Sequence, residues 1–118
     1  MNIKKKILDS IKQMRAQGYT LISEDWGNTK EKCACAMSCV ILSNNPRDGW
    51  LLGSSDSAQT AADVLEVNWD WIDSFLDGYD GNGDSKGARV KEAWEIGAEV
   101  AKEAKPITLT DFRKSNVK

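Results

Sequence analysis

The sequence predicts a single, mainly α domain of about five helices, joined by two or three short extended segments. Three observations lead to this prediction. The chain has 118 residues, which is enough for one hydrophobic core and too few for two. Apolar residues recur at intervals of three and four along much of the chain, which is the spacing of amphipathic helices. Clusters of Gly, Asn, Asp and Pro separate these stretches and are typical of turns.

The first helix is predicted over residues 3–17. Lysine and arginine side chains occupy the remaining surface of this helix, and Gly18 ends it. Residues 19–22, which follow, are a candidate short strand. The apolar face of the helix consists of four residues spaced by three or four positions: Ile3, Ile7, Ile11 and Met14.

The second helix, at about residues 30–43 with Thr29 as its N-cap, is apolar on every side and is therefore predicted to be buried. It contains Cys33, Cys35 and Cys39. An odd count with no distant cysteine argues against a disulfide framework. In a helix Cys33 points away from the other two, so three thiolates could not converge on one metal ion. We therefore interpret the cysteines as core residues.

Three further helices are predicted. Asn68 is the N-cap of the middle one, and the glycine-rich run from Gly78 onward ends it. Small residues on the inner face of the last helix would let a neighbouring helix approach closely. Pro106 ends the last helix. The helices lie at about 56–67, 69–77 and 85–104. A short strand is expected at 50–52, and an extended tail at 105–118 follows a compact core at 3–104 of the one domain, 1–118.

The net charge of −2 conceals a strong asymmetry. Residues 56–84 carry eight acidic side chains and no Lys or Arg, whereas residues 1–32 and 85–118 each carry a charge of +3. Such an acidic segment repels itself unless other charges neutralise it. Either the folded chain brings its basic ends alongside the segment, or the segment faces a cationic partner, which could be a basic protein surface or a divalent metal ion.

The helix at 69–77 concentrates this acid. Its apolar residues form one stripe, and its aspartates form a separate stripe flanked by two tryptophans. We therefore predict a non-enzymatic protein-interaction module, an inhibitor or adaptor, that presents an acidic, aromatic-flanked face to a basic partner. One form of such a module is a nucleic-acid charge mimic. The predicted partner-binding residues are Asp70, Asp73, Asp77, Trp69 and Trp71.

An alternative is a divalent-cation-binding domain. The run from Asp80 to Asp84 places oxygen side chains at positions 1, 3 and 5, as at the start of a calcium loop. The sequence then departs from the calcium-loop pattern, because it has Ser85 in place of the glycine of position 6 and Lys91 in place of the glutamate of position 12. Turn formation alone also explains Asp and Asn between glycines. The ligands of such a site would be Asp77, Asp80, Asn82 and Asp84.

A further alternative is a degenerate helix-turn-helix protein that contacts nucleic acid through its basic ends. Residues 61–78 follow the helix-turn-helix pattern of apolar positions. However, Glu66 stands where the turn usually has glycine, and the second helix exposes aspartates that would repel phosphate. Direct nucleic-acid binding by this helix is therefore not expected.

Several chemistries are excluded or disfavoured. The chain has no histidine, which removes Ser-His and Cys-His nucleophilic sites and every imidazole metal ligand. It contains no phosphate-binding glycine loop, and no cofactor or enzymatic activity is expected. No apolar run is long enough to span a membrane, and polar residues interrupt any signal-peptide core near the N-terminus. These features favour a cytoplasmic protein.

Three short motifs resemble those of a loose group of small, uncharacterised helical proteins. The group shares a Cys-Ala segment, a Phe-x-Asp-Gly-aromatic-Asp-Gly turn and a closing helix with a glycine. Here the corresponding residues are 33–37, 71–81 and 93–97, and the resemblance covers about residues 3–104. It implies a single helical domain and no particular activity.

Overall fold

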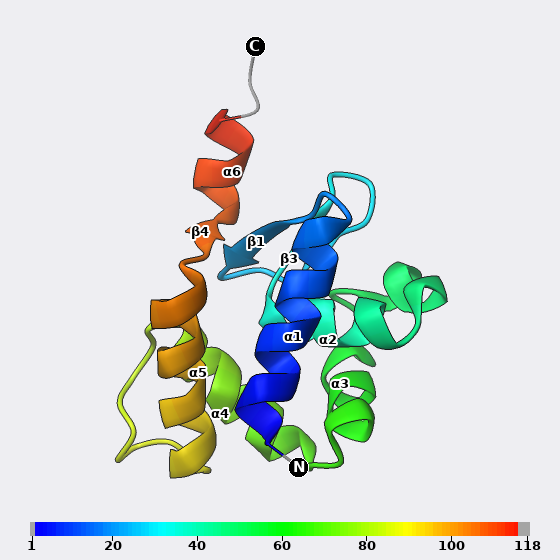
Figure 1. Cartoon of the computed structure of the whole chain (residues 1–118). Coiled ribbons are helices and arrows are strands. Elements are labelled where there is room, and N and C mark those ends of the chain that lie inside the picture. The colour runs from blue at the N-terminus through cyan, green and yellow to red at the C-terminus, as the bar shows by residue number, and fades with distance from the viewer. Residues whose placement is uncertain (1, 116–118) are drawn as a thin grey trace.

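The computed structural model describes residues 2–115, and helices dominate it (Figure 1). Within these residues there are seven helices, of which η1 is a 3-10 helix: α1 (Ile3–Ala16), α2 (Ala36–Asn44), η1 (Pro46–Leu51), α3 (Ser57–Leu65), α4 (Trp69–Asp80), α5 (Lys91–Ala104) and α6 (Leu109–Ser115). Four short strands accompany them: β1 (Thr20–Ser23), β2 (Gly27–Asn28), β3 (Cys33–Ala34) and β4 (Ile107–Thr108). The chain is one mainly α globule, as predicted, with more helices than the five expected.

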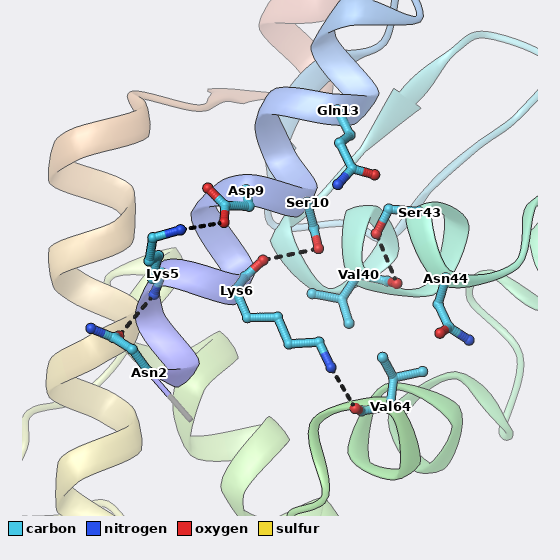
Figure 2. A pocket seen from close by; sticks show the side chains of 10 residues that line it. All are labelled: Asn2, Lys5, Lys6, Asp9, Ser10, Gln13, Val40, Ser43, Asn44 and Val64. Carbon is cyan, nitrogen blue, oxygen red and sulfur yellow. Dashed lines mark hydrogen bonds and ion pairs between the residues drawn. The ribbon is translucent and has the colours of Figure 1, made fainter.

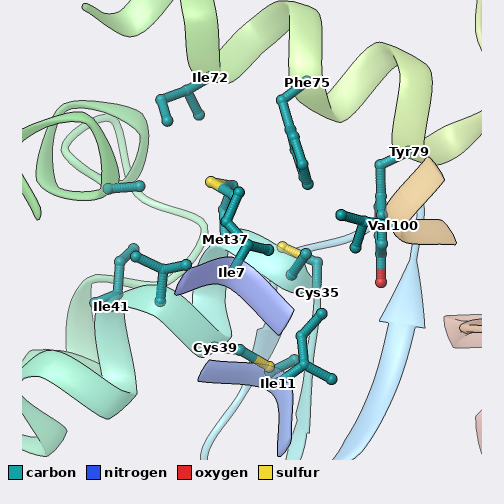
Figure 3. Packing of buried hydrophobic residues seen from close by; sticks show 14 of the residues in the cluster. Ile7, Ile11, Cys35, Met37, Cys39, Ile41, Ile72, Phe75, Tyr79 and Val100 are labelled. Carbon is teal, nitrogen blue, oxygen red and sulfur yellow. The ribbon is translucent and has the colours of Figure 1, made fainter. Parts of the chain in front are cut away.

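Helix α2 lies at the centre of the hydrophobic core. Every residue from Ala36 to Leu42 is buried, as predicted for a helix that is apolar on all sides. Helices α1 and α3 both pack against it. Figure 3 shows Met37 and Ile41 of α2 facing Ile7 of α1 and Phe75 of α4. The predicted apolar face of α1 is therefore confirmed as a core face.

The strands form a small four-stranded sheet in the order β2-β3-β1-β4. Strand β1 pairs in parallel with both β3 and β4, while β2 and β3 are antiparallel. The strand predicted at 19–22 corresponds to β1. The prediction of a helix from about residue 30 is wrong at its start, because Lys32 has a left-handed backbone (φ 54°) and a strand precedes the helix. Cys35, and not Thr29, is the N-cap of α2.

Two segments predicted to be extended are helical instead. Residues 50 and 51 belong to η1, in which Asn45 accepts a hydrogen bond from the Arg47 amide and Pro46 occupies the first turn. In the predicted tail, only β4 is a strand among the residues that the structure describes. Residues 109–115 form α6, which buries Phe112 against the sheet. Short apolar stretches fit either state, and tertiary contacts decide between them: η1 packs against α2, and α6 packs against β1.

Helices α4 and α5 pack with their backbones in close contact, and two glycines make this possible. A Cβ atom added to Gly78 would lie 2.0 Å from the Trp94 carbonyl oxygen, and one added to Gly97 would lie 2.0 Å from the Phe75 carbonyl oxygen. Gly97 thus confirms the predicted close approach. The prediction that Gly78 ends the helix is wrong, since α4 continues to Asp80 and Gly81 adopts the left-handed C-terminal conformation (φ 77°).

Candidate functional site

The candidate site is a groove between the outer face of α4 and the loop that leads into α5. Asn68 positions the start of α4, because its side-chain oxygen accepts a hydrogen bond from the Trp71 amide at 3.1 Å, as predicted. The groove has a volume of about 390 Å³. Its lining is mainly acidic on the helix side: Trp69, Asp70, Asp73, Ser74, Asp77, Gly87, Ala88 and Arg89.

Two hydrogen bonds hold the loop against the two helices, and a third braces the loop internally. The Val90 amide donates to the Ser74 hydroxyl of α4 at 3.1 Å. The Trp94 indole donates to the Asn82 carbonyl at 2.9 Å, and the Asp84 carboxylate accepts from the Gly87 amide at 2.8 Å. The far wall of the groove is therefore fixed by backbone and side-chain contacts before any partner arrives.

Among residues 2–115, the basic ends of the chain form an ion pair with one carboxylate of the acidic segment. Within residues 2–115, the one ion pair that involves a carboxylate of residues 56–84 joins Asp70 to Arg89, at 3.1 Å. Lys4 pairs instead with Glu99 and Glu103 of α5. The other ion pairs are Lys5 with Asp9 and Arg113 with Glu31. Of the two explanations for the acidic segment, internal pairing accounts for Asp70 alone among these described contacts.

The carboxylates of the groove repel one another. Burial raises the pKa of Asp73 above its ordinary value, and the negative charges of Asp77 and Asp70 raise it further. Arg89 offsets this only in part. A cation placed in the groove would relieve this repulsion.

The two tryptophans predicted to flank the acidic face differ. Trp69 is 49% exposed and lies at the edge of the groove, where it also lines a neighbouring hollow beside α3. Trp71 is only 9% exposed and stacks on Phe75, with the ring centroids 5.7 Å apart. Positions 71, 75 and 79 are four residues apart and share one face, so Trp71 belongs to the core. Trp71 therefore does not line the groove, and its role in partner binding stays a prediction.

The structure separates one of the four predicted metal ligands, Asp80, from the other three. Asp80 continues α4 and turns toward β1, where its carboxylate accepts a hydrogen bond from the Glu24 amide at 2.9 Å. Asp77, Asn82 and Asp84 line a separate hollow of about 200 Å³. Across the part of the chain that the structure describes, no three Cys, Asp or Glu side chains are grouped so as to hold a metal ion. Asp77, Asn82 and Asp84 thus share a hollow without Asp80, and the cation-binding alternative stays a prediction.

Cys39 lies within α2 as predicted, Cys33 and Cys35 precede that helix, and all three cysteines are buried and free. Cys33 lies in β3, and the Cys35 sulfur accepts a hydrogen bond from the Ser38 amide at 3.5 Å. Burial raises the pKa of each thiol, in Cys35 to about 11. Thiolate reactivity at neutral pH is therefore suppressed, in agreement with a structural role.

A second hollow, of about 450 Å³, lies between α1, α2 and α3 and had no signal in the sequence (Figure 2). Its polar side chains largely serve the fold. The Lys6 ammonium donates to the Val64 carbonyl at 3.1 Å near the end of α3, and the Ser10 and Ser43 hydroxyls donate to carbonyls of their own helices. The polar residues of the helix predicted at 3–17 could have indicated this surface only once its neighbours were known.

Comparison of the chain with protein-family models, with curated proteins and with solved structures finds no match. The resemblance to small helical proteins therefore stays a prediction. No helix among residues 2–115 is long and apolar enough to cross a membrane.

Proposed function

We propose that this protein is a non-enzymatic interaction module that presents the acidic groove of α4 to a basic surface of another protein. The observation that carries the proposal is the lack of counter-charges. Four carboxylates line the groove and its continuation at the C-terminal end of α4, yet Arg89 alone forms an ion pair with them among the described residues. Of these four carboxylates, Asp73, Asp77 and Asp84 form no ion pair with any residue of 2–115.

The shape of the groove supports a lysine or arginine side chain as the group that enters it. The rigid loop wall would align a long cationic side chain along the row of carboxylates. Trp69, half-exposed at the edge, offers an indole face to the aliphatic stem or to a guanidinium group. Charges of this kind act mainly by steering the encounter, so association should be fast and sensitive to salt.

A partner that normally binds nucleic acid is one class of basic surface that the groove would suit. In that case the aspartates would take the place of phosphate groups, and the protein would act as an inhibitor. Competition between this protein and a DNA duplex for the same partner would distinguish an inhibitor from an adaptor.

The test uses a lysine- and arginine-rich peptide, with backbone amide shifts as the readout. We expect saturable shifts confined to residues 69–77 and 84–90, with an affinity that falls steeply between low and high salt. The double variant Asp73→Asn/Asp77→Asn should weaken binding mainly by slowing association. A pull-down from the source cell at low and high salt would then identify the natural partner.

The matched control removes two carboxylates that already have a partner. Glu99→Gln/Glu103→Gln changes the net charge by the same amount, but on the face of α5 that pairs with Lys4. Its affinity for the peptide should stay near that of the wild type. Equal losses in both double variants, or shifts spread over the whole surface, would mean that the peptide senses net charge only and would contradict the proposal.

A further inference from the structure

The last described segment, β4 and α6, forms an arm that we call the C-terminal arm (residues 107–115). In Figure 1 the arm extends beyond the helical body and touches it beside β1. Strand β4 pairs with β1 through Ile107 opposite Ile22 and Thr108 opposite Ser23. Phe112 is buried with Ile22 and Cys33 in a small cluster that is separate from the main core.

A two-pronged ion pair fastens the arm to the loop between β2 and β3. The Arg113 guanidinium donates to both carboxylate oxygens of Glu31, at 2.9 and 3.3 Å. Asn28 orients the same carboxylate by donating to it at 3.0 Å. The arm is thus held by three contacts that depend on particular residues. These are a defined strand register, an aromatic side chain in an apolar site and a bidentate ion pair.

The arm is connected to α5 by a hinge of two residues, Lys105 and Pro106. Lys105 has a left-handed backbone (φ 52°), which is unfavourable for a residue with a Cβ atom. Pro106 restricts the preceding residue further, since it disfavours helical conformations there. Folding the arm back onto its own body therefore requires a strained hinge, and extending the hinge would release that strain.

We propose that the C-terminal arm exchanges between two copies of this chain, so that the arm of each copy packs on β1 of the other. Every contact of the arm would form again across the pair, while the hinge would open to an unstrained conformation. Short, strained hinges favour this kind of exchange. A second copy is the occupant that fits, because it supplies the same strand register, the same phenylalanine and the same arginine. The loss of translational freedom opposes pairing, so exchange should depend on protein concentration.

The first test refolds the full chain from denaturant at low and at high protein concentration and measures its mass by light scattering. We expect monomer, at 13.1 kDa, after dilute refolding and a growing fraction of twice that mass after concentrated refolding. Deletion of Lys105 and Pro106 should make the dimer predominant at concentrations at which the wild type refolds to monomer, because the arm could no longer reach its own β1. A folded monomer in both experiments would overturn the proposal.

The second test shows whether the arms themselves cross. Glu31→Arg and Arg113→Glu each place like charges at the ion pair, so each variant alone disfavours the closed arm. In a mixture of the two variants, exchange would bring the two substituted positions together across one contact and the two unchanged residues, Glu31 and Arg113, together across the other. Opposite charges would then meet at both contacts. We expect a several-fold larger dimer fraction in the mixture than in either variant.

Native mass spectrometry with one isotopically labelled variant should identify this dimer as a heterodimer. The control is the chain that carries both changes, Glu31→Arg/Arg113→Glu. It restores the ion pair internally with its charges reversed, so its dimer fraction should match that of the wild type. A mixture that dimerises no more than its components would overturn the exchange.

Discussion

Helix α4 presses its inner face against α5 so closely that two glycines are needed, whereas its outer face holds a row of carboxylates that, among the described residues, lack counter-charges except at Asp70. On the inner face, Trp71, Phe75 and Tyr79 lie along one line, with successive rings stacked 5.7 and 5.9 Å apart. Close packing therefore limits the size of the residues that the inner face tolerates. The negative charge of the outer face determines which groups could bind there.

The difference indicates where stability and function reside in this helix. Atoms added to or removed from the inner face change packing that the surrounding backbone cannot easily relax. Removal of a carboxylate from the outer face breaks few contacts, and it relieves repulsion. Substitutions on the two faces should therefore separate cleanly in their effect on unfolding and on association.

The largest effect is expected from Gly78→Ala. The new methyl group would meet the Trp94 backbone at 2.0 Å, so α4 and α5 would have to move apart. We expect the free energy of unfolding, measured with urea, to fall by about 3 kcal/mol. The control is Gly81→Ala, which has open space around it and suffers only from its positive φ, at a cost of about 1 kcal/mol. Equal losses in the two variants would contradict close backbone packing.

A smaller effect is expected from Tyr79→Phe, also on the inner face. The buried Tyr79 hydroxyl donates to the Ile22 carbonyl at 2.8 Å and so ties α4 to β1. Without this donor the buried carbonyl loses a partner, and the free energy of unfolding should fall by about 1–2 kcal/mol. Tyr19→Phe removes a hydroxyl from a half-buried ring and should change stability by less than about 0.5 kcal/mol. A neutral Tyr79→Phe would mean that the hydroxyl does not hold the helix to the sheet.

The two faces of α4 could be predicted from the sequence with unequal success. The helix and its buried face could be predicted from the apolar spacing of Ile72, Phe75 and Tyr79 and from the cap at Asn68, because both are local features of a helix. Trp71, expected at the flank of the acidic stripe, is buried in the core, since an aromatic residue at the boundary of a stripe is buried or exposed according to the element that packs beside it. Gly78 is wrongly predicted to end the helix, because glycine is typical both of a turn and of a close contact between helices.

Other parts of the molecule could not be predicted because they depend on contacts distant in sequence. The apolar run around Cys33 fits a helix, and it becomes a strand because β1 and β2 lie on either side of it. The acidic segment itself is evident from composition. Lys4 pairs with Glu103 and not with this segment because α1 packs on α5. This packing joins residues distant in sequence, so no local pattern predicts it.

The smallest effect concerns Asp73, on the outer face, and its dependence on pH. Burial and the charges of Asp77 and Asp70 raise the pKa of Asp73 in the folded protein above its ordinary value of 3.8. The folded state thus holds this proton more tightly than the unfolded state, so the contribution of Asp73 to stability falls as pH rises through the raised pKa. Asp73→Asn should stabilise the protein at neutral pH, by less than about 0.5 kcal/mol because solvent screens an exposed group. This advantage should vanish in acid, where Asp73 is protonated in both states.

The measurement is a series of urea titrations of the wild type and of Asp73→Asn between acidic and neutral pH. The same experiment with the lysine- and arginine-rich peptide present brings the pH dependence and the proposed function together. A cation in the groove favours the charged carboxylate, so the peptide should lower the pKa of Asp73, which carbon NMR of its carboxyl group can follow directly. A constant difference between the two proteins at every pH would show that Asp73 does not sense its neighbours. A pKa that the peptide leaves unchanged would place the peptide outside the groove, even if it binds.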